Sequence, residues 1–327
     1  MRWFISLIIL IGLIILVFGS VEAQNLNDGI IVHYSFDGHA IDDSGHKLNG
    51  KVLGVVPSNN RLSEKGKAFY FDGNSYIETP TDSRMYPEFP FSIAFWFRAE
   101  IIKAPDNLIL TTCYNRDQYH GLTVFFGSNR HVVGLTIGDG GPTVPEHRRS
   151  KVGTTIIQEG EWYHFAAVIE STEKMTIYIN GCDDLGSYSG TGERKIVYNK
   201  SPGNIGRADS SNDPNDPDQY YKGDLDEFYM WDRALTAEEV ALLYLGNMNY
   251  DIELGGDKIL CEGREYPISV HPIYDRITWS TGDTTPTLIV TKPGKYWVEG
   301  FIENCFYFRD TVEFKGSKCL KGGCGCK

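Results

Sequence analysis

Short apolar runs separated by turn signals extend along most of the chain, and this pattern predicts strands. Residues 91–97, Phe-Ser-Ile-Ala-Phe-Trp-Phe, alternate as a strand with one buried face does. Residues 175–179 are followed by Asn180-Gly181, the strongest short hairpin signal. Because such runs recur at short intervals with almost no helical pattern before Thr236, we expect residues 24–246 to form an all-β sandwich or jelly roll.

The end of this region has the pattern of a short helix. Thr236 and Glu239 have the spacing of a capping box, which marks a helix start. Val240, Leu243 and Tyr244 then give one apolar face, and a glycine, which favours helix ends, follows.

Two adjacent carboxylates, Asp226 and Glu227, interrupt the apolar strand that precedes this helix. Unpaired carboxylates are costly in apolar surroundings. A nearby hydrogen-bond donor or a hard cation is therefore expected to compensate them.

A second set of short strands occupies residues 257–314. A segment of this length suits a smaller, Ig-like β-sandwich, with Trp279 as the core residue between its two sheets. Residues 247–256 form the expected linker between the domains. Residues 315–327 are rich in Gly, Lys and Cys, and they are expected to be a flexible tail without a core of its own.

The first residues have the pattern of an export signal. Arg2 is followed by an apolar run over residues 3–18 and by a Val-Glu-Ala end at Ala23. We expect residues 1–23 to be a signal peptide that is cleaved, although the length of the run also fits a retained membrane anchor. No later segment is long and apolar enough to span a bilayer. The mature protein is therefore expected to be secreted or held at the cell surface.

Charge and cysteine content narrow the partners and the compartment. The net charge is −12, and no basic stripe is present, so nucleic acid is not an expected partner. Disulfides are permitted in an exported protein, and an odd cysteine count leaves at least one thiol outside intramolecular pairs. The seven cysteines are Cys113, Cys182, Cys261, Cys305, Cys319, Cys324 and Cys326.

Eight short motifs stand in the order found in a known family. They occupy residues 34–38 (Tyr-Ser-Phe-Asp-Gly), 43–45 (Asp-Ser-Gly), 71–77, 91–96, 162–166, 178–181, 204–206 and 223–235. Together they resemble the laminin-G-like domains of the concanavalin A-like lectin/glucanase superfamily, which occur in many bacterial surface proteins. The resemblance implies a concanavalin A-like jelly roll that binds more often than it catalyses.

The same resemblance implies a structural Ca²⁺ ion. Members of the family often hold one between the early Asp-Ser-Gly turn and the closing Asp-Glu strand, which here are Asp43 and the pair Asp226 and Glu227. Calcium takes six to eight oxygens, so backbone carbonyls or waters must complete the shell. The alternative is that Asp43 caps a tight turn through its own backbone and that Asp226 faces solvent.

The second domain resembles the Ig-like or PKD-like modules of surface and secreted proteins of gliding bacteria. The residues that carry this resemblance are 260–263 (Leu-Cys-Glu-Gly), 279–285 (Trp-Ser-Thr-Gly-Asp-Thr-Thr), 294–298 (Gly-Lys-Tyr-Trp-Val) and Cys305. Cys261 near the first strand and Cys305 near the last are expected to form a disulfide, which typically adds roughly 3–4 kcal/mol.

No catalytic motif is recognisable. Glycoside hydrolases of this superfamily place two or more carboxylates along one strand, with alternate residues facing the cleft. The nearest pattern, Asp-Leu-Asp-Glu at residues 224–227, lacks that arrangement. His164 lies in an apolar strand and is expected to be a hydrogen-bonded core residue.

The sequence therefore predicts an exported binding or adhesion protein that is not an enzyme and that recognises an extracellular glycan or a surface protein through jelly-roll loops. The candidate ligand loops are residues 114–119, 138–149 and 209–221, which carry aromatic or polar side chains. One alternative is a polysaccharide-degrading enzyme or its carbohydrate-binding accessory module. A second alternative is a structural spacer of an extracellular layer.

Overall fold

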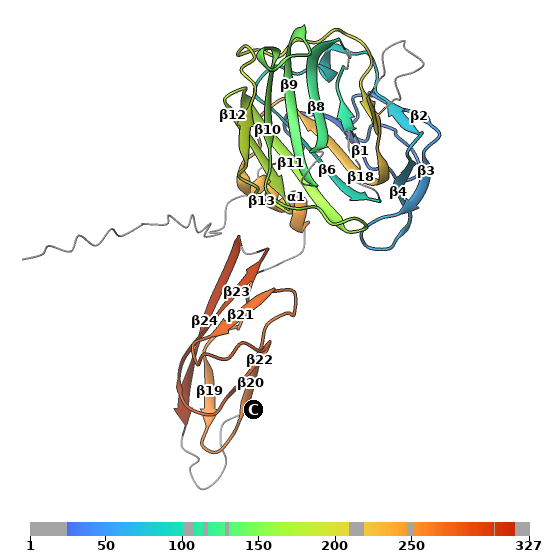
Figure 1. Ribbon diagram of the computed structural model, residues 1–327. Helices are drawn as coiled ribbons and strands as arrows, with labels where there is room; N and C mark the ends of the chain where they lie inside the picture. The colour runs from blue at the N-terminus through green and yellow to red at the C-terminus, as the bar shows by residue number, and fades with distance from the viewer. Residues whose placement is uncertain are drawn as a thin grey trace, which may run out of the picture. The chain divides into compact units, whose positions relative to one another are not determined.

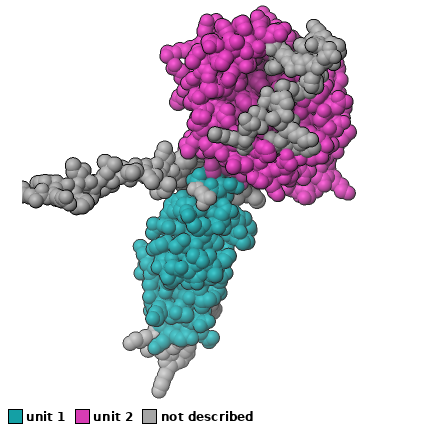
Figure 2. All heavy atoms as spheres, in the orientation of Figure 1, with its two compact units in different colours: residues 1–22, 247–327 teal, residues 23–246 magenta. Residues whose placement is uncertain are grey.

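The computed structural model describes residues 25–100, 108–113, 117–127, 131–208, 219–246, 251–303 and 305–317. These residues belong to two compact units, one within residues 23–246 and the other within residues 247–327 (Figure 2). Both units are built from strands, so the all-β prediction is confirmed. The predicted signal peptide and the cysteines of the tail lie outside the described residues.

Two eight-stranded sheets make up the first unit (Figure 1). The first sheet has the strand order β13-β12-β11-β6-β18-β4-β3, and β1 also pairs with β18. Its strands are β1 (Ile30–Tyr34), β3 (Val56–Asn59), β4 (Lys65–Asp72), β6 (Phe91–Ala99), β11 (Trp162–Ser171), β12 (Lys174–Ile179), β13 (Cys182–Asp183) and β18 (Lys222–Trp231).

The second sheet has the strand order β14-β10-β9-β8-β7-β15-β5-β2. Its strands are β2 (Lys51–Leu53), β5 (Tyr76–Glu78), β7 (Leu108–Thr111), β8 (Gln118–Gly127), β9 (Val132–Pro142), β10 (Arg148–Val152), β14 (Ser187–Ser189) and β15 (Asn204–Ile205). The remaining elements of this unit are the two-stranded pair β16 (Arg207–Ala208) and β17 (Gln219–Tyr220), two short 3-10 helices, η1 (Ser83–Met85) and η2 (Pro145–His147), and one α-helix, α1 (Ala237–Leu245).

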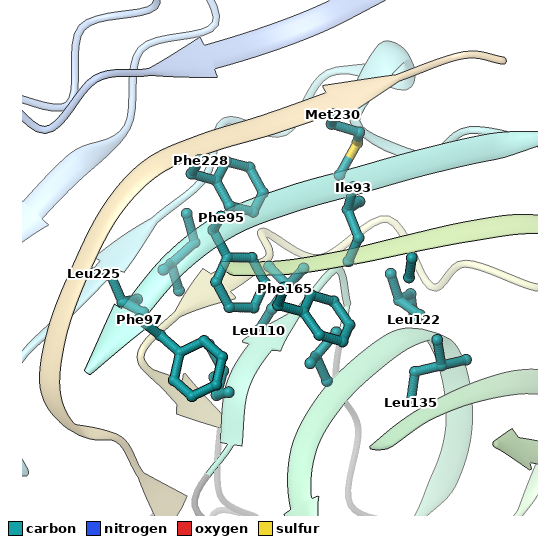
Figure 3. Close-up of a cluster of buried hydrophobic side chains, with 14 of the residues drawn as sticks. Ile93, Phe95, Phe97, Leu110, Leu122, Leu135, Phe165, Leu225, Phe228 and Met230 are labelled. Atoms are coloured by element: carbon teal, nitrogen blue, oxygen red, sulfur yellow. The ribbon is translucent and has the colours of Figure 1, made fainter. Parts of the chain in front are cut away.

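The core lies between the two sheets, and β6 shows how the alternating pattern builds it. Phe91, Ile93, Phe95 and Phe97 are buried in this core as the alternation predicts. The residues between them, Ser92, Ala94 and Trp96, are buried as well, so the expectation of a single buried face is wrong for β6. Figure 3 shows the rings of Phe95, Phe97 and Phe165 beside leucines from β7, β8 and β9 of the second sheet. The hairpin predicted from Asn180-Gly181 is also confirmed. The two residues lie between the paired strands β12 and β13, and both have the positive φ angles of a tight hairpin turn.

Helix α1 covers the outer face of the first sheet. Its predicted capping box is confirmed, because the Thr236 hydroxyl accepts a hydrogen bond from Glu239 N, and the Glu239 carboxylate accepts one from Thr236 N. Glu239 is 1% exposed and forms an ion pair with Arg233. Val240 packs with Ala94 and Trp231 in a small cluster, so this part of the sheet is buried on both faces.

The second unit contains a four-stranded and a two-stranded sheet (Figure 1). The larger has the order β19-β24-β23-β21, in which β19 runs parallel to β24, and the smaller pairs β20 with β22. Trp279 is buried, as expected of a core residue. The Ig-like identity of this unit stays a prediction. The strands are β19 (Lys258–Cys261), β20 (Tyr266–Ser269), β21 (Arg276–Trp279), β22 (Thr287–Val290), β23 (Gly294–Ile302) and β24 (Phe306–Ser317).

None of the helices within the described part of the chain has the length and hydropathy needed to cross a membrane.

Candidate ligand-binding site

A β-bulge in β18 sets the positions of the two adjacent carboxylates. Asp226 lies opposite Trp96 and Tyr229 lies opposite Ala94, so β18 has one residue more than β6 over this stretch. The bulge contains Glu227, whose φ of 53° is in the left-handed region that residues other than glycine rarely adopt. Bulges of this kind redirect side chains and often lie beside functional sites.

The Glu227 carboxylate is held by two neighbours. Its Oε2 accepts hydrogen bonds from His33 Nε2 at 2.7 Å and from the Tyr229 hydroxyl at 2.8 Å. The His33 and Tyr229 rings stack with their centroids 4.0 Å apart. Burial raises the pKa of Glu227, but these hydrogen bonds outweigh burial and hold the pKa below its usual value. Glu227 is therefore ionised, and its Oε2 is already engaged in two hydrogen bonds.

Asp226 is buried more deeply than Glu227, and only 2% of its surface is exposed. Its Oδ2 lies 3.4 Å from Arg61 Nη1, while its Oδ1 is buried with no hydrogen-bond partner among the described residues. Burial, together with the neighbouring charge of Glu227, raises the pKa of Asp226 to about 8. The Arg61 guanidinium also lies over the Trp96 ring, 4.3 Å from its centroid. Sequence reasoning expected a donor or a cation here, and Arg61 is such a donor.

The three predicted calcium ligands are not brought together. Asp43 is exposed, and its neighbour Asp42 is the buried turn residue, which accepts hydrogen bonds from the backbone N–H groups of His33, Ser44 and Leu48. In the part of the chain that the structure describes, no three His, Cys, Asp or Glu side chains are grouped to hold a metal ion. The calcium ion that the resemblance implies therefore stays a prediction.

His164 lies in the same cross-strand row, on the other side of Trp96 from Asp226. Its ring is buried between Trp96 and Tyr244, and its Nδ1 has no hydrogen-bond partner among the described residues. Burial lowers the pKa of His164 to about 3, so the ring is neutral. The predicted core position is confirmed, and of the expected hydrogen bonding none is seen at Nδ1 among the described residues.

The predicted Cys261–Cys305 disulfide is incompatible with the strand register. Cys261 lies beside Ser317, at the end of β24, whereas Cys305 precedes Phe306, at the start of β24. Twelve residues of extended chain place them roughly 40 Å apart, and a disulfide requires Cα atoms within about 7 Å. Both cysteines are disulfide-bonded, as is Cys182, so their bonds are to other cysteines. Cys113 is a buried free thiol.

A hollow of about 850 Å³ opens at the same end of three neighbouring strands of the second sheet, where β9 begins, β10 ends and β14 begins. Two large apolar side chains at its rim face solvent: Leu185 is 67% exposed and Ile156 is 61% exposed. Leu185 has a φ of 53°, so an exposed leucine is held in a backbone conformation that usually costs about 1 kcal/mol or more. The hollow is lined by His131, Val132, Gly153, Thr154, Ile156, Leu185, Gly186 and Ser187.

The buried Asp184 carboxylate fixes the rim of this hollow. It accepts hydrogen bonds from Thr154 N at 3.0 Å and from Thr155 N at 2.9 Å, and both threonine hydroxyls also bond to it. A Cβ at Gly153 would collide with the Asp184 carboxylate, and a Cβ at Gly186 would collide with a backbone carbonyl. The two segments of the rim are thus locked together at close approach, which preorganises the hollow for a ligand.

Of the predicted ligand loops, residues 138–149 are not among those that line the hollow. Residues 138–149 span β9, η2 and β10, where Asp139 accepts a hydrogen bond from His147 at 3.0 Å. Residues 114–116 and 209–218 lie outside the described residues. Sequence reasoning missed the hollow because three segments distant in the chain form it. The available signal was a leucine between Asp184 and Gly186, in a turn where a polar residue is usual.

The chain matches one family model and several solved structures. The laminin G family model described as the Concanavalin A-like lectin/glucanases superfamily matches residues 71–241, more than half of the 327 residues. No curated protein matches the sequence.

Three solved structures are similar to the chain at low identity, and the two with a TM-score of 0.50 or more show the same fold. Domain 4 of AbnA, an extracellular GH43 arabinanase from Geobacillus stearothermophilus, in complex with arabinotriose, is 21% identical, with a TM-score of 0.49 over 66% of this chain and 98% of that chain. The binding domain of Paraclostridial Mosquitocidal Protein 1 is 18% identical, with a TM-score of 0.52 over 84% of this chain and 64% of that one. The ligand-binding domain of botulinum neurotoxin serotype D, in complex with N-acetylneuraminic acid, is 14% identical. Its TM-score is 0.50 over 85% of this chain and 72% of that one.

Proposed function

Because the chain belongs to the concanavalin A-like lectin/glucanases superfamily, we propose that it is a binding module that takes an extracellular glycan at the hollow beside Leu185. The observation that carries this proposal is the exposed Leu185 in a left-handed conformation, on a rim that Asp184 holds rigid. Backbone strain and apolar exposure both cost stability, and surfaces that retain them are commonly functional.

The lining of the hollow suits the mixed surface of a sugar. Leu185 and Ile156 offer apolar contact to C–H faces, while Thr154, Ser187 and His131 offer groups that hydrogen-bond to hydroxyls. A concave site with apolar walls and a few fixed polar groups is the usual form of a small-ligand site. The mosquitocidal and neurotoxin structures are binding domains by their descriptions, and the latter holds a sugar acid, which supports a glycan for this chain.

Binding without catalysis is part of the proposal. A glycosidase needs two carboxylates that reach the scissile bond from either side. The side chain of Asp226 is almost fully buried, and Glu227 is engaged by His33 and Tyr229. These partners support a structural role for the pair, and no chemistry is assigned to it.

A glycan array followed by a reducing-sugar assay tests the proposal. We expect binding to at least one glycan and no release of reducing ends from it. Leu185→Ala and Ile156→Ala should weaken binding without changing the melting temperature, because both side chains are exposed. The matched control is Leu62→Ala, since Leu62 is 66% exposed but lies outside the hollow. Hydrolysis that is lost in Glu227→Gln would favour the enzyme instead, and failure to bind any glycan would favour a protein ligand or a spacer.

Export is proposed on the sequence of residues 1–23 alone. Cell fractionation with N-terminal sequencing tests it. A mature N-terminus at Gln24 is the expected result, and a retained Met1 in the membrane fraction would indicate the anchor.

A further inference from the structure

The second unit carries five aromatic and arginine side chains on one surface, which we call the arginine-aromatic face: Arg276, Trp297, Phe301, Tyr307 and Arg309. They come from the three neighbouring strands β21, β23 and β24. Arg276 lies opposite Phe301, and Phe301 lies opposite Tyr307, so these three form one row across the sheet.

The face is the outer side of the four-stranded sheet. Along β23, Val298 and Ile302 are buried, whereas Trp297, Glu299 and Phe301, which alternate with the buried positions, are only partly buried. The outer face of an antiparallel sheet is normally polar. Three large aromatic rings there depart from the alternation that builds the core, so packing of this unit does not account for them.

The rings hold the two arginines in place. The Arg276 guanidinium lies 4.0 Å from the centroid of Phe301, and the Arg309 guanidinium lies 4.8 Å from that of Trp297. Arg309 also contacts Glu299 at 3.3 Å, but Arg276 has no ion pair with any carboxylate that the structure describes. A guanidinium fixed on a ring with its N–H donors unpaired is well suited to bind a carboxylate.

From this geometry we propose that the arginine-aromatic face binds an acidic polysaccharide that carries carboxylates. Arg276 and Arg309 are two strands and two residues apart, which places their Cα atoms about 12 Å from each other. The rings that hold the guanidinium groups, Phe301 and Trp297, are four residues or about 13 Å apart along β23. One small anion does not bridge that distance, whereas a polymer with repeated carboxylates does. The face presents side chains rather than backbone groups, so a peptide lying across it would gain no backbone hydrogen bonds from β23 and β24, which are each paired on both sides.

Charge decides between the possible polyanions. The outer side of the sheet carries two guanidinium groups, the opposed pair Lys295 and Glu313, and Glu299, within a chain of net charge −12. Duplex DNA carries about one charge per 1.7 Å and needs a row of cations to hold it. Two arginines on an acidic protein suit a polymer with sparser charge, such as a chain of uronic acids.

Affinity electrophoresis of the full chain in gels that contain polygalacturonate tests the proposal. We expect retardation that declines with salt and that is absent with the fully methyl-esterified polymer, which has the same rings without the charge. The double variant Arg276→Gln with Arg309→Gln should weaken binding at least tenfold. Arg264→Gln with Lys292→Gln is the matched control, because it removes two positive charges from exposed sites outside the face. Arg276→Lys should bind less well than the parent, since lysine keeps the charge but lacks the planar fork.

Three results would overturn the proposal. Equal retardation of the double variant and the parent would show that the face is not the site. Retardation by polyglutamate or by duplex DNA at the same concentrations would assign the face to a protein or a nucleic acid partner, and a dimer lost in the double variant would assign it to a second copy. Leu185→Ala should leave polygalacturonate binding unchanged, so this test stands apart from that of the hollow.

Discussion

Replacing Glu239 with glutamine should destabilise the first unit strongly. Glu239 is 1% exposed, and its two oxygens accept hydrogen bonds from Arg233 at 2.6 and 2.8 Å and from Thr236 N at 2.8 Å. Breaking a buried ion pair from one side typically costs about 3–5 kcal/mol, because the remaining charge is left uncompensated. Arg233 stays partly hydrated, so we expect about 3 kcal/mol for Glu239→Gln.

Differential scanning calorimetry of the full chain measures this effect, and the transition of the second unit serves as an internal reference. The control is Glu238→Gln, which removes a charge from the same helical turn and should cost only about 0.5 kcal/mol through the helix dipole. The pKa of Glu239 is held below its usual value, since hydrogen bonds from Arg233 and Thr236 outweigh burial. Its contribution is therefore present above the unfolded pKa and is lost as pH falls through the folded pKa. Equal effects of the two substitutions would refute the role assigned to the buried pair.

Three further outcomes are expected. A chelator should leave the melting temperature of the first unit unchanged, because Arg61 and His33 already contact the Asp226 and Glu227 carboxylates; a clear fall, with one calcium per chain by elemental analysis, would instead support the calcium prediction. Non-reducing peptide mapping should yield no peptide that links Cys261 to Cys305, and recovery of that peptide would contradict the register of β19 and β24. His164→Phe should reduce the loss of stability that accompanies a fall in pH from 6.5 to about 3, because in that window only the histidine of the unfolded chain takes up a proton. An unaltered pH profile of the melting temperature would show that the ring is not kept neutral.

Local patterns in the sequence predicted what depends on local physics. The alternation of residues 91–97 predicted the core face of β6, and the spacing of Thr236 and Glu239 predicted the start of α1. The Asn180-Gly181 pair likewise predicted the turn between β12 and β13. Each of these features is set by residues within a few positions of one another, so no knowledge of the tertiary arrangement was needed.

Features that depend on contacts distant in the chain could not be predicted in this way. Strand order decides that Cys261 and Cys305 lie at opposite ends of β24, and their positions in the sequence contain no sign of it. Arg61 and Asp226 are 165 positions apart in the sequence. The sequence therefore predicted that a donor or a cation would compensate Asp226, but it did not identify Arg61 as that donor. The hollow combines three segments, two of which are joined through the Asp184 carboxylate, and the sequence shows this residue only as one of many aspartates.

The binding isotherm of Leu185→Ala tests the central claim most directly. Full burial of a leucine side chain is worth about 1.5–3 kcal/mol, and two-thirds of this side chain remains to be covered by a ligand, which leaves about 1–2 kcal/mol. Isothermal titration with the tightest glycan from the array should therefore show a Kd raised roughly 5- to 30-fold in Leu185→Ala and unchanged in Leu62→Ala, whose side chain is equally exposed at 66%. Identical isotherms for the parent and Leu185→Ala would contradict the assignment of the hollow as the ligand site.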